Sequence, residues 1–383
     1  MDLADFAPPQ RAYIVRAEAG YNAFVPPPLP PTVVLDSGLV RKLSAADRAI
    51  GELAGLGRSL PNPNLLSRAL MRREAVLSSR IEGTQASLSD LVLFEVEPTN
   101  DVSDVREVYN YLQAVEHVLA PDRRLPVSLS LLREAHQILL TGTRGAHATP
   151  GEFRRSQNWI GPPGAVVDTA TYVPPPERLW HCLDPFEKFL HASGELPLLM
   201  AIGAIHYQFE AIHPFVDGNG RVGRLLVVLL LVEWGLLPAP LLDLSAYIEP
   251  RRDSYYSGLF NVTAQADWNG WLSFFLDVVA YQARDALKRA RALQDLRERM
   301  RERTMVSRAS ASSARLVDAL FDIPMLTIPR AQALLGVTHR AASLNIDKLV
   351  ELGILREVQV GRRPRLFVAP DVMAAVETSD PPR

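Results

Sequence analysis

The residues from His213 to Arg224 read HPFVDGNGRVGR and bring together an imidazole, a carboxylate and two guanidinium groups. The imidazole of His213 can act as a general base near neutral pH. Arg221 and Arg224 are three positions apart, so both lie on one side of a helical turn, and arginine binds phosphate through two parallel hydrogen bonds. The carboxylate of Asp217 can hold Mg²⁺ between phosphate groups. This set of groups predicts attack on a nucleotide phosphate.

A Gly-Asn-Gly turn, residues 218–220, separates the carboxylate from the arginines. Residues 198–212 are apolar with helical spacing, and Pro214 ends that helix because the residue before a proline is disfavoured in the α conformation. A second apolar helix is expected at 221–234. The turn therefore lies at a helix N-terminus, where unpaired N–H groups and the positive dipole end bind anions, and glycine allows close approach to a phosphate.

The pattern H-P-F-x-D-G-N-G-R-x-x-R is similar to the signature of the Fic family, with every position filled, and residues 206–212 (HYQFEAI) resemble the family's approach to its histidine. The resemblance implies protein AMPylation, in which AMP passes from ATP to a Ser, Thr or Tyr hydroxyl of a protein, the enzyme itself included. It implies that His213 is the catalytic base and that Asp217 binds Mg²⁺, or Mn²⁺ in its place. It implies nucleotide contacts from Gln208, Gly218, Asn219, Gly220, Arg221, Arg224 and Tyr247.

In the implied mechanism, the amides of 218–220 and the side chain of Asn219 stabilise the α-phosphate, while Arg221 and Arg224 hold the β and γ groups. Residues 246–256 resemble a family segment that lines the nucleotide site. They lack the asparagine that the family often has there, and tyrosines such as theirs are more often core residues than ligands.

A helix expected at about 64–83 ends in the hexapeptide SSRIEG. Ser78 and Glu82 are four residues apart and share a helix face, and a glutamate at a helix C-terminus is disfavoured by the dipole, which favours a partner cation. The hexapeptide resembles the inhibitory motif [ST]-x-x-x-E-[GN] of Fic proteins that carry it upstream of the core. The resemblance implies that Glu82 pairs with Arg224 and denies it to the γ-phosphate of ATP. The alternative is a solvated surface glutamate.

The composition is that of an ordinary globular protein: 383 residues, 48% hydrophobic and 22% charged, with a net charge of −2 that gives no general attraction to nucleic acid or membrane. The first residues, MDLADFAPPQ, do not resemble a signal peptide, and the apolar run 225–232 is too short to cross a bilayer, so a cytoplasmic protein is expected.

The single cysteine, Cys182, excludes an internal disulfide and is expected to be a small buried apolar residue. His206 and Asp217 could join His213 in a metal site, but a core role for His206 is favoured because no ligand triplet has close helical spacing.

The helical patterns predict a mostly α protein: a helical Fic core with a short β-hairpin flap, followed by a C-terminal winged helix-turn-helix domain. We expect an N-terminal arm and helical region at 1–100, the Fic core with a long helix at 101–305, and the winged helix at 314–372.

The proline-rich stretch 26–31 predicts a rigid arm packed on its own domain, with a ligand for a partner domain as the alternative. Residues 151–176 are turn-rich between two short extended segments, which favours a hairpin. Their position resembles the Fic flap, which by that resemblance docks the target segment by strand addition. A plain structural loop is the alternative.

The C-terminal third begins with a long helix at 271–303 that turns charged, which favours a solvated spacer or a helix that forms a homodimer. Helices at 328–335 and 338–352 have helix-turn-helix spacing. Strands at 354–360 and 365–368 follow, and the whole resembles a winged helix.

Two uses of the winged helix stay open. In DNA binding, the tip at 361–364 would meet phosphates and a groove would be faced by His339, Arg340, Ser343 and Asn345. The alternative is protein contact or dimerisation.

Three rivals to AMPylation remain. Glu82 could orient water and remove AMP from a modified protein, as the resemblance permits. Transfer of phosphate or phosphocholine is a second rival, which the intact Gly-Asn-Gly turn and both arginines disfavour. The third is a non-enzymatic regulator in which the Fic core senses nucleotide and the winged helix binds DNA.

Overall fold

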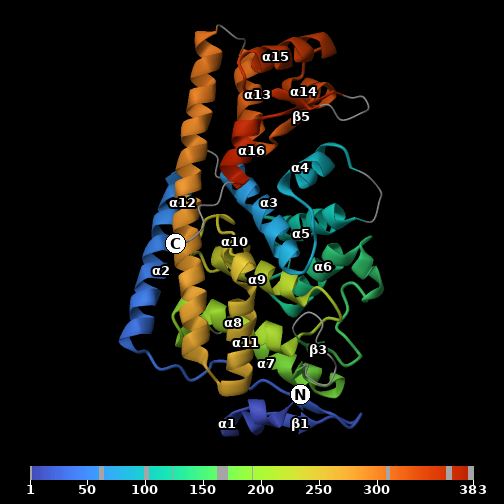
Figure 1. Ribbon diagram of the computed structural model, residues 1–383, viewed down its shortest axis with the longest axis vertical. Coiled ribbons are helices and arrows are strands. Elements are labelled where there is room, and N and C mark those ends of the chain that lie inside the picture. The colour runs from blue at the N-terminus through green and yellow to red at the C-terminus, as the bar shows by residue number, and fades with distance from the viewer. Residues whose placement is uncertain are drawn as a thin grey trace.

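The computed structural model describes residues 2–59, 64–98, 103–123, 125–161, 171–191, 193–307, 311–358 and 365–377. It is mostly helical, as the sequence predicts. Figure 1 shows an elongated molecule in which the long helix α12 runs from the helical body to the C-terminal unit at the opposite end. Among the described residues, no helix combines the length and apolar character that crossing a membrane requires.

The body of the molecule is built from helices and two small hairpins. Its α-helices are α1 (Pro8–Arg11), α2 (Ser37–Ser59), α3 (Asn64–Ile81), α4 (Leu88–Val96), α5 (Asp104–Val118), α6 (Leu129–Leu140), α7 (Leu179–His191), α8 (Leu198–Ile212), α9 (Asn219–Glu233), α10 (Ser245–Ile248), α11 (Arg252–Gln265) and α12 (Trp268–Val306). Its 3₁₀ turns are η1 (Leu3–Asp5), η2 (Arg144–His147), η3 (Pro176–Arg178), η4 (Ser193–Glu195) and η5 (Glu249–Arg251). Its strands are β1 (Ile14–Arg16), β2 (Asn22–Phe24), β3 (Trp159–Ile160) and β4 (Thr171–Tyr172), paired antiparallel as β1–β2 and β3–β4.

Helices α8 and α9 form the centre of the body. Both are apolar on all sides and buried over most of their length, which is the pattern of a helix inside a protein core. They pack on each other, and α5, α6, α7, α11 and α12 pack around them. Each fully buried leucine or isoleucine contributes about 1.5–3 kcal/mol, so the segment joining α8 to α9 is held at both ends by strong packing.

The expectation of a solvated spacer is wrong for α12. The helix lies along α2 in Figure 1, and its charged part keeps a buried stripe that includes Leu293, Leu296 and Met300. Charged residues alternate with this stripe at helical spacing, so a helix that looks polar in sequence still covers a core.

The N-terminal arm packs on its own domain, as the favoured alternative expects. The side chain of Gln10 donates to the carbonyls of Val262 and Thr263 at 2.9 Å, and the carbonyl of Pro27 accepts from Gln208 at 3.0 Å. Cys182 is buried in the core, also as expected.

The C-terminal unit contains α13 (Ala311–Asp322), β5 (Met325–Thr327), α14 (Ile328–Leu335), α15 (His339–Glu351), β6 (Arg356–Val358), β7 (Leu366–Val368) and α16 (Pro370–Glu377). The strand order is β5-β7-β6, all antiparallel, with Phe367 opposite both Leu326 and Glu357. The unit contacts α3 through Arg68, which pairs with Asp322 at 3.0 Å.

Two of the four residues expected to face a DNA groove are engaged locally instead. The amide oxygen of Asn345 accepts from Ser313 at 2.8 Å, which turns it toward α13, and Ser343 bonds Asp347 on its own helix. His339 and Arg340 are exposed. The expected wing tip at 361–364 and the middle of the expected flap, 162–170, lie outside the described residues.

Candidate active site

His213 lies where α8 ends, as the sequence predicts. It caps the helix in the left-handed conformation (φ 51°, ψ 60°), and its N–H donates to the carbonyl of Phe209 at 2.9 Å. Its Nδ1 lies 3.2 Å from the carbonyl of Glu210, and because a carbonyl only accepts, Nδ1 carries the proton and Nε2 keeps its lone pair. Burial lowers the pKa of His213 to about 4, so the ring is neutral at pH 7.

Arg154 holds the backbone around this histidine. Its Nε donates to the carbonyl of His213 at 2.8 Å, and its Nη2 donates to the carbonyls of Pro174 at 2.6 Å and Ile212 at 3.3 Å. Its own N–H donates to the carbonyl of Pro214 at 2.9 Å. The side chain is buried, and burial lowers its pKa to about 10. Sequence reasoning missed this role, because nothing in the local pattern distinguishes Arg154 from a surface arginine at the start of a flap.

The loop after His213 is closed by Asn219. The amide oxygen of Asn219 accepts from the N–H of Phe215, and its amide nitrogen donates to the carbonyl of Phe215, both at 2.9 Å. Phe215 is fully buried and anchors the loop in the core. The Asn219 side chain is therefore directed into the loop. Its expected contact with the α-phosphate stays a prediction.

A second histidine that sequence reasoning missed supports the same loop from α6. Nδ1 of His136 accepts from the N–H of Gly151 at 2.9 Å, so Nε2 carries the proton and donates to the carbonyl of Asp217 at 3.0 Å. The ring stacks on Phe215 with centroids 3.8 Å apart. Burial lowers the pKa of His136 to about 4. This one side chain ties the loop to the first residue of the flap region.

The N-terminus of α9 forms the floor of the site. The helix begins at Asn219, two residues before the expected start, and Gly218 takes the left-handed conformation (φ 78°) that lets the chain turn into it. The first N–H groups of a helix have no acceptor within it, so they point out of the helix end and favour an anion.

Arg224, in the next turn of α9, is fully buried and is held by the end of α3 and the residue that follows it. Its Nη2 donates to Oε1 of Glu82 at 2.6 Å and to the carbonyl of Ser78 at 3.0 Å, and its Nε donates to the hydroxyl of Ser78 at 2.8 Å. Burial opposes the charge of Arg224, but the Glu82 carboxylate outweighs it and raises the pKa of the arginine above its ordinary value. The structure thus brings together the three residues that the inhibitory motif would join.

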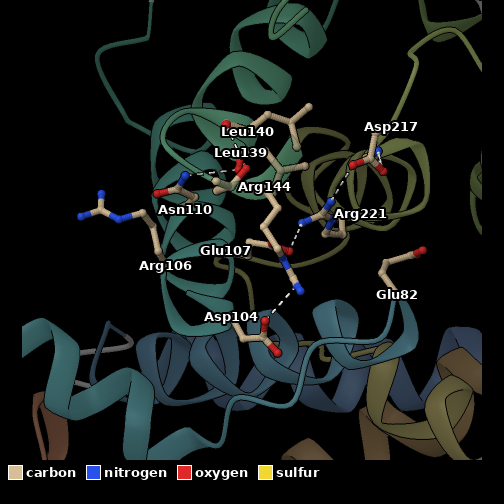
Figure 2. A network of polar contacts seen from close by, with 12 residues as sticks. Glu82, Asp104, Arg106, Glu107, Asn110, Leu139, Leu140, Arg144, Asp217 and Arg221 are labelled. Carbon is tan, nitrogen blue, oxygen red and sulfur yellow. Dashed lines mark hydrogen bonds and ion pairs between the residues drawn. The ribbon is translucent and has the colours of Figure 1, made fainter. Parts of the chain in front are cut away.

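Arg221 has a different acid, Glu107 of α5, as Figure 2 shows. Nη1 of Arg221 donates to Oε2 of Glu107 at 3.3 Å, and Nη2 lies 3.8 Å from Oδ2 of Asp217. The other Glu107 oxygen accepts from Nε of Arg144 at 2.9 Å. Sequence reasoning missed Glu107 because it is far from the motif in the chain and sits in an ordinary amphipathic helix.

Asp217 fits the role of an Mg²⁺ ligand. Its side chain is about half exposed, and one oxygen accepts from the N–H of Gly218 at 2.6 Å while the other faces Arg221. In the part of the chain that the structure describes, no group of three or more metal-ligating side chains gathers. Mg²⁺ at nucleotide sites commonly uses one or two carboxylates together with substrate phosphates, so a single aspartate suffices.

The chain matches two family models. Residues 40–120 match the model described as Fic/DOC family N-terminal, and residues 126–231 match the one described as Fic/DOC family. The chain carries both Fic/DOC family domains. The Protein adenylyltransferase Fic of Drosophila persimilis is 31% identical over 162 residues, which are 40% of this chain and 28% of that protein. A probable protein adenylyltransferase of Aquifex aeolicus is 28% identical over 192 residues, 48% of this chain and 55% of that protein. This chain thus spans about a quarter to a half of the length of these curated relatives.

Solved structures share the fold. A Fic family protein from Desulfovibrio desulfuricans G20 aligns with a TM-score of 0.58 at 22% identity, over 89% of this chain and 98% of that chain. Fic-1 from C. elegans aligns with a TM-score of 0.52 at 20% identity, over 67% of this chain and 74% of that chain.

Two residues expected to contact the nucleotide, Gln208 and Tyr247, have other partners in the structure. Gln208 is buried and its amide donates to the N-terminal arm, as described above. Tyr247 packs 5.2 Å from Tyr281 and under the guanidinium of Arg251, where it lines an open cavity of about 400 Å³ between α2 and α12. The charges of Glu82 and Arg224 act on both Tyr255 and Tyr256, and burial, the largest cause, raises the pKa of Tyr256 to about 12.

His206 is a core residue of the Fic domain, as the favoured alternative predicts. It is buried, and its Nε2 lies 2.9 Å from the hydroxyl of Tyr255. Burial lowers the pKa of His206 to about 3. Among the described residues, His206, His213 and Asp217 do not gather into a metal site.

Proposed function

We propose that the protein is a protein adenylyltransferase, which transfers AMP from ATP to a Ser, Thr or Tyr hydroxyl of a protein, and that Glu82 holds it in an inhibited state. The observation that carries the proposal is the arrangement around His213. Its Nε2 is unprotonated, and the loop that follows it leads directly into the helix end where Arg221 and Arg224 are buried.

The chemistry follows from these positions. Nε2 of His213 takes the proton of the target hydroxyl, whose oxygen then forms a bond to the α-phosphorus of ATP as the bond to pyrophosphate breaks. The amides at the start of α9 stabilise the charge on the α-phosphate. Arg221 and Arg224 bind the β and γ groups. Asp217 would hold Mg²⁺, which when bound reduces the negative charge of the phosphates.

The proposed inhibition is supported by the contacts of Arg224. Its Nε and Nη2 are committed to Ser78 and Glu82, so the γ-phosphate would have to displace a carboxylate. The triphosphate would then bind with its α-phosphate badly aimed at His213. Removal of AMP by water that Glu82 orients is the alternative activity of the same site.

Incubation with α-labelled ATP and Mg²⁺ tests the proposal. Weak self-labelling is expected of the native protein, stronger labelling of Glu82→Gly, and none of His213→Ala. Labelling from γ-labelled ATP would instead show kinase chemistry and overturn the proposal.

We also propose that the C-terminal unit is a winged helix that binds DNA. The element order α13-β5-α14-α15-β6-β7, with strand order β5-β7-β6, supports the assignment, and His339 and Arg340 are exposed at the start of α15. A mobility-shift assay against genomic fragments tests it. Binding that weakens in Arg340→Ala is expected, and no shift at low salt would contradict it.

A further inference from the structure

We propose that Glu107 is a positioning residue for nucleotide binding: it holds the guanidinium of Arg221 in the orientation in which that arginine receives the β-phosphate of ATP. The inference rests on the proposed function. It concerns a residue of α5 that lies outside both motifs.

The carboxylate of Glu107 is fixed on both sides. One oxygen accepts from Nη1 of Arg221 and the other from Nε of Arg144, and the side chain of Glu107 is 9% exposed. A buried carboxylate between two guanidiniums is stable only in this bridging position, because moving it would leave a charge unpaired in a poorly solvated place.

The backbone that carries these groups is also fixed. The amide of Asn110, one turn after Glu107, donates to the carbonyls of Leu139 at 3.2 Å and Thr141 at 2.7 Å. This contact joins α5 to the end of α6, from which the chain enters the turn that carries Arg144. Figure 2 shows Glu107, Asn110 and Arg144 as one group on this side of Arg221.

One of the remaining donors of Arg221 faces the loop. With Nη1 on Glu107, Nη2 faces Asp217 at 3.8 Å, and the buried Nε has no hydrogen-bond partner among the described residues. A long arginine side chain normally loses much rotamer freedom when it binds a ligand. Because Glu107 restrains Arg221 beforehand, less freedom is lost when phosphate binds.

The same network reaches the segment that follows Glu82. Arg144 also pairs with Asp104 at 2.8 Å, and the other oxygen of Asp104 accepts from the N–H of Gln85 at 2.6 Å. A continuous set of contacts therefore joins Glu107, which holds Arg221, to the turn after Glu82, which holds Arg224.

Binding measurements separate positioning from a merely structural ion pair. In the Glu82→Gly protein, calorimetry gives the Kd of α,β-methylene-ATP, which cannot transfer AMP, and of AMP, which lacks the β-phosphate. Adding Glu107→Gln is expected to raise the Kd of the ATP analogue about tenfold, which corresponds to the loss of one charge-assisted hydrogen bond. The Kd of AMP is expected to rise less than about twofold. In a protein that also carries Arg221→Ala, Glu107→Gln is expected to leave the Kd of the ATP analogue and the Kd of AMP unchanged.

The control is Glu116→Gln, also on α5. The Glu116 carboxylate lies 3.6 Å from Nη2 of Arg68 and does not contact the motif. It should leave both Kd values unchanged. If Glu107→Gln does not fold, Glu107→Asp tests the proposal instead. The aspartate keeps the charge but is too short to reach Arg221 in the same way, so it should weaken binding of the ATP analogue and not that of AMP.

An unchanged or tighter Kd for the ATP analogue, or an equal loss for analogue and AMP, would overturn the positioning role. If the Glu82→Gly protein binds neither nucleotide, the proposed function itself fails.

Discussion

Oε1 of Glu82 lies 2.6 Å from Nη2 of Arg224, and the same oxygen covers the Cα of Gly220 so closely that a Cβ built there would lie 2.3 Å from it. One carboxylate, from the residue that follows α3, therefore occupies both a buried guanidinium and the space above the first turn of α9. An anion already lies where the proposed function would put the end of a triphosphate.

Removing this carboxylate should increase activity. We expect Glu82→Gly to label at least about tenfold faster than the native protein, because a freed charge-assisted hydrogen bond of Arg224 becomes available to the nucleotide. Glu82→Gln keeps the side-chain volume and should gain less. The measurement is the rate of incorporation from α-labelled ATP, and a Gln variant as active as the Gly variant would show that charge, not space, maintains the inhibition.

The contact with Gly220 predicts a specific pair of stability effects. Gly220→Ala should destabilise the native protein by about 1–3 kcal/mol, because the new methyl group overlaps Glu82. In the Glu82→Gly background the same substitution should cost less. Chemical unfolding of the four proteins gives the coupling, and additive effects would place the strain elsewhere.

Arg154 should matter to both stability and activity. Arg154→Ala leaves the carbonyls of His213, Ile212 and Pro174 without their donor, so we expect about 3 kcal/mol of lost stability and a large fall in labelling. Arg154→Lys restores the charge but not the planar fork and should recover stability only in part. Full recovery of activity by lysine would contradict the role of hydrogen-bond geometry.

His136 should affect the rate more than the fold. His136→Phe keeps an aromatic ring against Phe215 but loses the bonds to Asp217 and Gly151, so the loop should be less well placed and labelling should fall about tenfold. His136→Gln can still donate and accept and should retain more activity. The thermal midpoint, measured beside the rate, should fall less in His136→Phe than in Arg154→Ala, because fewer hydrogen bonds are lost and the ring stacking is kept, and an equally large fall in stability would indicate a packing role alone.

Two buried histidines, His136 and His206, and the partly buried His213 make stability depend on pH. Burial lowers the pKa of His136 and His213 to about 4 and that of His206 to about 3, whereas the unfolded chain titrates near pH 6.5. As pH falls below about 6.5, these histidines become protonated in the unfolded state but stay neutral in the folded state. Stability is therefore lost from about pH 6.5 down to about pH 4. Each histidine should cost about 2 kcal/mol by pH 5, and His136→Gln should reduce the slope of unfolding free energy against pH.

Activity should follow a related but distinct profile. A base with a pKa of about 4 is unprotonated throughout neutral pH, so the labelling rate per folded molecule should be flat between pH 6 and 8 and fall only as pH approaches 4. Rates measured in the Glu82→Gly protein over this range check the prediction. A midpoint near pH 6.5 would mean that His213 is solvated and titrates as an ordinary histidine.

The sequence by itself determined the local features of the site. The apolar spacing and Pro214 placed His213 at a helix end, and the Gly-Asn-Gly turn placed a helix start that can bind an anion after it. The four-residue spacing of Ser78 and Glu82 predicted that they lie on the same side at the end of their helix. These are properties of a few consecutive residues, whose conformation is set by backbone sterics and by hydrophobic periodicity.

Only the tertiary structure decided which helix faces meet. Glu107 and Arg221 are 114 residues apart, and His136 and Asp217 are 81 apart, and no local pattern marks either pair. The same holds for the observed partners of Gln208 and Tyr247, whose side chains contact the N-terminal arm and α12. Periodicity shows that a face will be buried, but its partner is chosen by the packing of the whole core, and polar groups then bond whatever that packing brings within reach.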